Sequence, residues 1–265
     1  MQSESSIFVD LKITVLFKDY EKPLTDKIQI LGIPLDVISS EQIKNLLSDA
    51  IVSERKMTIC NINVHAVNIS DSNPEFSATL RSSDLVICDS DIVRIIARLI
   101  YGVRVQKLTG SRWFIDFIST YKNPIRVFLL GDREEILKGS QNFISNLNEH
   151  AIINTHHGFF KETEIGSVVK KINEFNPNIL LIGMGMPKQE IFIRSHFDEL
   201  PNAVMIPVGG AFKYWAGVYD QAPKWMLALN LEWLHRIYQE PVRLGKRYVL
   251  DFVQFTIRFI FLLRK

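Results

Sequence analysis

Residues 179–190 read ILLIGMGMPKQE, a short apolar run that ends in glycines and leads directly into a polar, helix-forming segment. The same arrangement, an apolar run followed by a helical segment, recurs along the chain from residue 28. Continuous apolar runs are typical of strands that are buried on both faces, and their alternation with amphipathic helices predicts a parallel sheet. The fold class is therefore α/β, with helices on both faces of the sheet.

The full set of predicted elements follows from this alternation. Strands are predicted at residues 57–63, 85–88, 126–130, 151–155, 179–184 and 204–208. Helices are predicted at residues 40–54, 74–82, 91–101, 112–121, 133–147, 162–175 and 188–199. Residues 7–17 alternate loosely and are compatible with a strand or an ordered extension. In a parallel sheet the ligand crevice lies at the carboxyl ends of the strands, so the functional residues are expected just after each run.

Length and composition exclude several classes of protein. The chain has 265 residues, of which 47% are apolar and 23% charged, which excludes a disordered or fibrous protein. Cys60 and Cys88 both lie inside apolar runs, so we expect buried, reduced cysteines and no zinc site. The net charge of +2 is too small for a non-specific nucleic-acid binder. Residues 232–265 carry seven basic and three acidic side chains, net +4, so the positive charge belongs to the C-terminal end.

The chain shows no targeting or membrane-spanning pattern. Charged residues interrupt the early apolar stretch, so a secretory signal is not expected. No segment has 18 uninterrupted apolar residues, which argues against an ordinary transmembrane helix. In residues 249–263, 11 of 15 residues are apolar, and this segment could lie on a bilayer without crossing it.

Polar side chains follow two of the predicted strands. Asn63 can bind a sugar or a nucleotide, although asparagine is also a common helix cap. Asp89 is well placed for general-base chemistry at the mouth of the sheet. The sequence Asp89-Ser90-Asp91 has the look of a DxD signature, which holds a divalent metal in many nucleotide-sugar enzymes, but Asp91 also fits as the N-cap of the next helix. We expect a catalytic base at Asp89, no metal and no cofactor.

Small turns that contain glycine follow the other strands. Glycine lets a ligand approach the backbone, and a helix N-terminus beyond such a turn suits a phosphate. An ordinary capped loop explains the turn after residue 108 about as well. Gln189 can read the edge of a uracil or a sugar. The predicted substrate-binding residues are Asn63, Thr109, Gly110, Gly131, Gly185, Lys188, Gln189, Gly209 and Gly210.

The C-terminal segment adds three basic residues to this set. Arg236, Arg243 and Arg247 could gather around an anionic group, or they could belong to a basic, solvated helix pair. Apolar residues at helical spacing follow them at Val249, Phe252, Val253, Phe259, Ile260 and Leu263. This tail is predicted to lie on a membrane, with packing on the core or on a second subunit as the alternative.

Several motifs together carry a resemblance to a known family. They are NVH, LTGS, FLLG, GMGMPKQE, VGGAF, QAPKWM and LEWLHRIYQEPVRLGKRY, in this order. Over residues 28–250 the chain resembles the WecG/TagA/CpsF family of bacterial glycosyltransferases. The resemblance implies a Rossmann-like sheet followed by a C-terminal helical appendage that associates with the membrane. It divides the chain into an N-terminal extension at residues 1–27, a catalytic core at residues 28–210 and the appendage at residues 211–265.

The resemblance also implies an activity and its partners. Members are similar in moving a sugar from a UDP-sugar to a polyprenyl-diphosphate-linked saccharide, with inversion and without a metal, in the synthesis of envelope or exopolysaccharide polymers. Such a protein would act in the cytoplasm at the inner face of the cell membrane, as a monomer or a homo-oligomer. A nucleic-acid partner is not expected. The donor would be N-acetylmannosamine-type or another hexose or uronic acid.

The resemblance also implies roles for individual residues. Asp89 matches the proposed base of an Asp-Gly motif, with Ser90 in place of the glycine. Arg236, Arg243 and Arg247 match arginines thought to close over the donor diphosphate. Other departures are Asn61 for a threonine, Lys213 for an acidic residue and Gln221 for an arginine.

Two other classes remain as alternatives. The first is a non-catalytic nucleotide-binding or scaffold component of an envelope polysaccharide assembly complex. The second is a Rossmann-type oxidoreductase, which the missing third glycine and the missing ribose-binding acid after Gly183-Met184-Gly185 disfavour.

Overall fold

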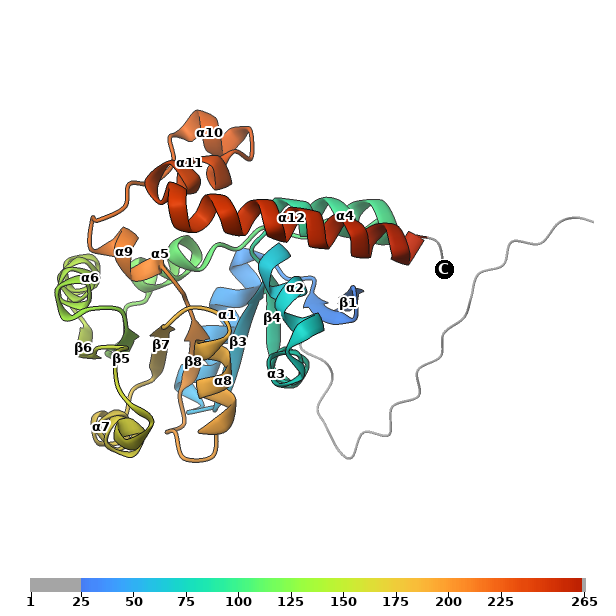
Figure 1. The fold of residues 1–265 in the computed structure, drawn as a ribbon. Coiled ribbons are helices and arrows are strands. Elements are labelled where there is room, and N and C mark those ends of the chain that lie inside the picture. Colours follow the sequence, from blue (N-terminus) through green and yellow to red (C-terminus); the bar gives the residue numbers. More distant parts are fainter. Residues whose placement is uncertain (1–24, 264–265) are drawn as a thin grey trace, which may run out of the picture.

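The structure, a computed structural model, describes residues 25–263. Its centre is a six-stranded sheet with the strand order β4-β3-β8-β7-β5-β6 (Figure 1). All five strand pairs are parallel, which confirms the predicted sheet type. The strands are β3 (Met57–Ile62), β4 (Leu85–Cys88), β5 (Ile125–Gly131), β6 (Ala151–His156), β7 (Ile179–Gly183) and β8 (Val204–Pro207).

Both faces of the sheet are covered by helices, as predicted. Alternate side chains of one strand point to opposite faces, so Leu129 and Leu181 lie in one apolar cluster and Leu130 and Ile182 in another. The first face is covered by α1 (Ser40–Val52), α5 (Gly110–Thr120), α6 (Glu134–Leu147) and α9 (Ala211–Trp215). The second is covered by α2 (Val64–Ser72), α3 (Pro74–Ser82), α4 (Asp91–Tyr101), α7 (Ile165–Phe175) and α8 (Lys188–Ser195).

A β-hairpin that the sequence analysis did not predict precedes the sheet. It consists of β1 (Lys27–Ile30) and β2 (Ile33–Asp36), joined by Leu31 and Gly32, which both have positive φ. Its last residue, Asp36, is fully buried and accepts a hydrogen bond from the backbone N–H of Val86 at 2.7 Å. The hairpin therefore covers the edge of β4. Of the predicted extension at residues 1–27, residues 1–24 lie outside the described residues. Lys27 is already part of β1.

Other differences from the prediction lie at the ends of elements. Asn63 begins a helix, α2, instead of ending a strand, because its side chain caps the backbone N–H of Ala66 at 2.9 Å. Ser90 caps α4, so Asp91 is its first helical residue and not its cap. The predicted helix at residues 162–175 is a 3₁₀ turn (Glu162–Glu164) followed by α7, and α8 ends at Ser195.

The chain ends in three further helices, α10 (Lys224–Ala228), α11 (Glu232–Gln239) and α12 (Pro241–Leu263). Figure 1 shows α12 as the long helix that runs across the molecule from α11 towards the C-terminus. It packs on α2, and its Phe255 is only 3% exposed. The preceding helix α9 buries Phe212 and Trp215 in the core, while the division of the chain after residue 210 stays a prediction. Among residues 25–263, no helix combines the length and the apolar character needed to cross a bilayer.

Candidate active site

Asp89 lies directly after β4, at the carboxyl edge of the sheet, and its backbone N–H donates to the carbonyl of Ile62 at 2.9 Å. The side chain is partly buried, and burial raises the pKa of its carboxyl group above the ordinary value. The positive charges of Arg236 and Lys107 oppose this rise in the pKa of Asp89 without cancelling it, and Glu232 adds to it. A carboxylate with a raised pKa is a better proton acceptor near neutral pH, as a general base requires.

The loop before α5 brings Thr109 to Asp89. The backbone N–H of Leu108 donates to the carbonyl of Cys88 at 2.7 Å, which ties this loop to β4. Thr109 is 6% exposed, makes no side-chain cap of α5, and its hydroxyl lowers the pKa of Asp89 by hydrogen bonding. The predicted donor residues Thr109 and Gly110 therefore belong to the same site as the predicted base.

Asn61 is a polar residue that the sequence analysis noted only as a departure from the family pattern. Its side chain is 6% exposed, and its Nδ2 donates to the carbonyl of Pro207 at 2.8 Å. Its Oδ1 has no hydrogen-bond partner within residues 25–263. Asn63, by contrast, uses its oxygen to cap α2, and its contact with a donor stays a prediction.

Gln189 joins the glycine turns that follow β7 and β8. Its Oε1 accepts hydrogen bonds from the backbone N–H groups of Gly185 and Gly209, both at 3.1 Å. Its Nε2 donates to Glu190 at 2.8 Å, and the side chain is only 1% exposed. Hydrogen bonds within the protein thus engage both ends of the Gln189 amide. A direct contact of this amide with uracil or a sugar stays a prediction. The neighbouring Lys188 is exposed at the start of α8.

Gly131 is required by packing between strand ends. Its φ is +139°, and a Cβ at this position would lie 2.5 Å from the carbonyl carbon of Gly183. Gly209 also has a positive φ of +53°, whereas a Cβ on Gly209 or on Gly210 would meet no atom within 4 Å. The turn after β8 is therefore open, as a ligand-facing turn must be.

Of the three predicted arginines, Arg236 lies near enough to Asp89 for its charge to lower the pKa of that carboxyl group. Arg236 lies on α11, its Nη2 is 3.1 Å from Glu232, and Asp89 is the main cause that raises its pKa against the effect of burial. Arg243 pairs with Glu240. Arg247 lies 4.0 Å from Asp251 and over the ring of Tyr248. That these two arginines also close over a diphosphate stays a prediction.

Lys213 contacts the C-terminal helices. Its Nζ lies 3.6 Å from Glu240 at the end of α11, and it also lies over the ring of Tyr219. The residue that departs from the family pattern thus links α9 to the segment that carries Arg236.

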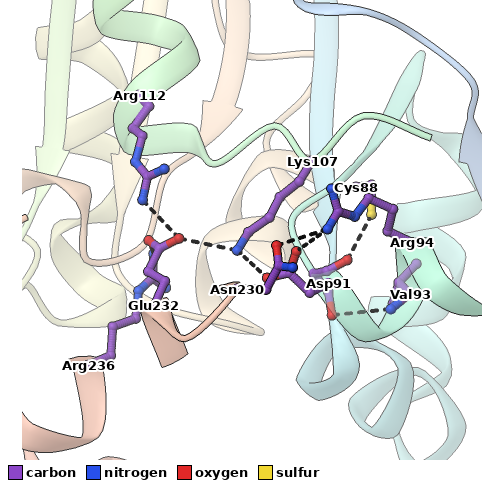
Figure 2. A network of polar contacts seen from close by, with 10 residues as sticks. Cys88, Asp91, Val93, Arg94, Lys107, Arg112, Asn230, Glu232 and Arg236 are labelled. Atoms are coloured by element: carbon purple, nitrogen blue, oxygen red, sulfur yellow. Dashed lines mark hydrogen bonds and ion pairs between the residues drawn. The ribbon is translucent and has the colours of Figure 1, made fainter. Parts of the chain in front are cut away.

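An ion-pair network that the sequence analysis missed surrounds this site (Figure 2). Four cations pair with two carboxylates, and the members are Arg94, Lys107, Arg112, Arg236, Asp91 and Glu232. The pairs Arg94–Asp91 and Arg236–Glu232 each lie within one helix, but the pairs of Glu232 with Lys107 and Arg112 join distant parts of the chain, so no local motif could reveal the network. The surplus of positive charge favours an anionic ligand.

A cavity of about 250 Å³ lies within this network. Its lining includes Asp91, Lys107, Thr109, Arg112 and Glu232, so it is shared by the core and α11. A larger cavity of about 540 Å³ lies elsewhere, between the β-hairpin, α2 and the C-terminal half of α12.

The two aspartates of the DxD-like motif have different surroundings. Asp91 lies 2.7 Å from the Nζ of Lys107 and 3.0 Å from Arg94, so cations occupy its carboxylate. Within residues 25–263, no three His, Cys, Asp or Glu side chains are grouped as a metal site requires. The metal-free reaction stays a prediction.

Comparison with known proteins gives the family. The sequence profile of the glycosyl transferase WecG/TagA/CpsF family matches residues 28–265. The chain belongs to this family. It is therefore a glycosyltransferase, in agreement with the motifs and their order.

Curated relatives lie within the same family of glycosyltransferases. An N-acetylglucosaminyldiphosphoundecaprenol N-acetyl-beta-D-mannosaminyltransferase from Staphylococcus aureus strain MW2 is 26% identical over 231 residues, which is 85% of this chain and 90% of the relative. Proteins of the same name from strains NCTC 8325 / PS 47 and MRSA252 match at the same identity and coverage.

Proposed function

We propose that this protein is an inverting glycosyltransferase that moves a sugar from a UDP-sugar to a polyprenyl-diphosphate-linked saccharide. The main support is the position of Asp89, a carboxyl with a raised pKa directly after β4, close enough to Arg236 of α11 for the two charges to act on each other. The names of the relatives support the acceptor class, since each contains a saccharide linked to diphosphoundecaprenol.

The proposed reaction is a single displacement. Asp89 takes the proton of an acceptor hydroxyl, and the oxygen attacks the anomeric carbon from the face opposite UDP. The bond from that carbon to the β-phosphate oxygen breaks, and UDP leaves with the bonding electron pair. The charge that develops on UDP needs stabilisation, and guanidinium groups suit phosphate oxygens.

Arg236 is the cation best placed for this role, with Lys107 and Arg112 nearby in the network. The Nε of Arg236 has no hydrogen-bond partner within the described residues, so this buried donor is free for a ligand. Arg243 and Arg247 are proposed to join Arg236 when the donor is bound.

The exposed face of α12 is proposed to lie on the membrane that holds the acceptor. Phe255 and Phe259 pack towards α2 and the core, whereas Val249, Phe252, Val253 and Ile260 are exposed. Burial of such side chains in a lipid interface is favourable. Membrane contact would bring the active site to a lipid-linked acceptor.

A UDP-release assay with a panel of UDP-sugars tests the proposal, with a short-chain prenyl-diphosphate-linked N-acetylglucosamine as acceptor. We expect acceptor-dependent release with one donor, UDP-N-acetylmannosamine being the first to try because of the relatives' names. The release should be insensitive to EDTA. Loss of release in EDTA would instead make Asp89 and Asp91 a metal pair.

The alternative function is a non-catalytic nucleotide-binding or scaffold component of an assembly complex. Such a protein would bind a nucleotide and release no UDP with any donor and acceptor. It would also work in cells with Asp89→Asn, because a binding protein needs no base.

A further inference from the structure

Glu232, the first residue of α11, is the centre of the contacts between α11 and the core (Figure 2). Its side chain is 9% exposed. Its Oε2 lies 2.9 Å from the Nη2 of Arg112 and 3.2 Å from the Nζ of Lys107, and its Oε1 lies 3.1 Å from Arg236. One carboxylate therefore connects two cations of the core with Arg236, whose charge acts on Asp89.

A second group of contacts fastens the turn before α11. Arg94 of α4 donates to the side-chain oxygen of Asn230 at 2.9 Å and pairs with Asp91 at 3.0 Å. Asp91 in turn pairs with Lys107. Both groups of contacts share Lys107, so the docking of α11 depends on a connected set of charges.

The charge of Glu232 is maintained by these contacts. Burial by itself would raise the pKa of Glu232, but the charges of Arg236, Lys107 and Arg112 outweigh it and lower the pKa below the ordinary value. A buried carboxylate is tolerated only with such partners, and removal of its charge leaves Arg112 and Arg236 without their ion-pair partner. Both oxygens of Glu232 are occupied by cations, which leaves neither free to bind a substrate.

We propose that Glu232 is a positioning residue, whose carboxylate fastens α11 to Lys107 and Arg112 and thereby keeps the guanidinium of Arg236 beside Asp89. This inference rests on the proposed function for its catalytic meaning. The docking of α11 can be tested without any substrate.

Hydrogen exchange on the full chain measures docking directly. In Glu232→Gln we expect amide exchange in residues 224–239 to rise at least tenfold, while exchange in β5 and β7 is unchanged. The matched control is Glu174→Gln, which removes an exposed ion pair with Lys170 on α7 and should leave residues 224–239 unchanged. Unchanged exchange of this segment in Glu232→Gln would overturn the proposal.

Arg112→Gln is a second variant for the case in which Glu232→Gln does not fold. Arg112 is 36% exposed, so its removal costs the fold less, yet it takes one partner from Glu232. We expect exchange in residues 224–239 to rise in the same direction and by a smaller factor. Protection equal to that of the unmodified chain would count against a role of Glu232 in docking.

The pH profile separates positioning from a mere charge effect. The groups that act on Asp89 are Arg236 and Glu232 from α11 and Lys107 and Thr109 from the loop before α5, and Tyr214 and Tyr248 act on Arg236. If Arg236 stays in place, removal of the negative charge of Glu232 lowers the pKa of Asp89. If Arg236 moves away while Asp89 stays as buried as before, loss of the larger effect of Arg236 raises that pKa.

We therefore expect the acidic limb of the pH profile, where kcat/KM falls as Asp89 becomes protonated, to move to higher pH in Glu232→Gln. In Glu232→Asp, which keeps the negative charge, this limb should return towards its original position. A shift to lower pH together with unchanged hydrogen exchange in residues 224–239 would overturn the positioning role. Absence of transfer in the unmodified chain with every donor would count against the proposed function alone, because hydrogen exchange still decides the docking of α11.

Discussion

At the residue scale, the proposed reaction depends on the ionisation of Asp89. Its pKa is raised by burial, which Arg236 and Lys107 only partly oppose. A base acts in its ionised form, so activity is lost as the pH falls through this raised pKa. The pKa of an ordinary aspartate is about 4. We expect the acidic limb of the pH profile of kcat/KM to lie at a higher pH than this.

The measurement is the rate of acceptor-dependent UDP release between pH 4 and 9. The variant Lys107→Met removes a positive charge that lowers the pKa of Asp89, so its acidic limb should lie at higher pH. A limb at the same pH in both proteins would mean that another group limits the rate.

Glu190 is a second buried carboxyl with a perturbed pKa. It is fully buried, its Oε2 has no partner within residues 25–263, and burial raises its pKa from 4.5 to about 7. A carboxyl group whose pKa is higher in the folded state than in the unfolded state makes its full contribution to stability at pH values below the unfolded pKa. This stabilisation is lost as the pH rises from 4.5 to 7.

We expect Glu190→Gln to remove this dependence on pH. Compared with the variant, the unmodified chain should lose about 3 kcal/mol of unfolding free energy between pH 4.5 and 8. Urea denaturation at both pH values measures this difference, with Glu174→Gln as an exposed control. Parallel pH dependence of the unmodified chain and Glu190→Gln would contradict the assignment.

At the scale of elements, α12 has two faces with different roles. One face docks on α2, where Asp251 lies 3.0 Å from His65 and Arg258 lies 2.6 Å from Asp71. The opposite face exposes large apolar residues, among them Phe252 at 59% and Ile260 at 45%. The contacts of the first face hold the helix on the protein, and the second is the face that we propose lies on a membrane.

The double variant Phe252→Ser and Ile260→Ser tests the exposed face. Each large apolar side chain contributes about 1.5–3 kcal/mol when fully buried, so we expect binding to anionic vesicles to fall at least tenfold in flotation. Val52→Ser, which changes an exposed apolar residue of α1, should float like the unmodified chain. Equal flotation of the double variant and the unmodified chain would refute the membrane role of α12.

At the scale of the whole molecule, the sequence predicted the sheet well because its signal is local. Buried runs such as residues 85–88 coincide with β4 (Leu85–Cys88). The β-hairpin was missed because its turn places Leu31 at positive φ, which no turn motif predicts. Helix α2 was missed because the cap at Asn63 follows a strand without a separating loop.

The site could be predicted only in part, because some of its residues follow local patterns and others meet only in the folded chain. Asp89 and the glycine turns follow strands and can be found from local pattern, whereas the pairs of Glu232 with Lys107 and Arg112 join positions more than a hundred residues apart. The role of Gln189 also needed the structure, since its two glycine partners lie on different turns.

The role of Asp89 as the base is tested by comparing donor binding and transfer in the unmodified chain with those in Asp89→Asn. Calorimetry with the UDP-sugar found in the panel should give similar affinities, because the amide keeps the shape of the side chain. Acceptor-dependent transfer in Asp89→Asn should fall by about 10² to 10⁴, the typical contribution of a general base. Transfer at the original rate, with donor binding intact, would contradict the assignment of Asp89 as the base.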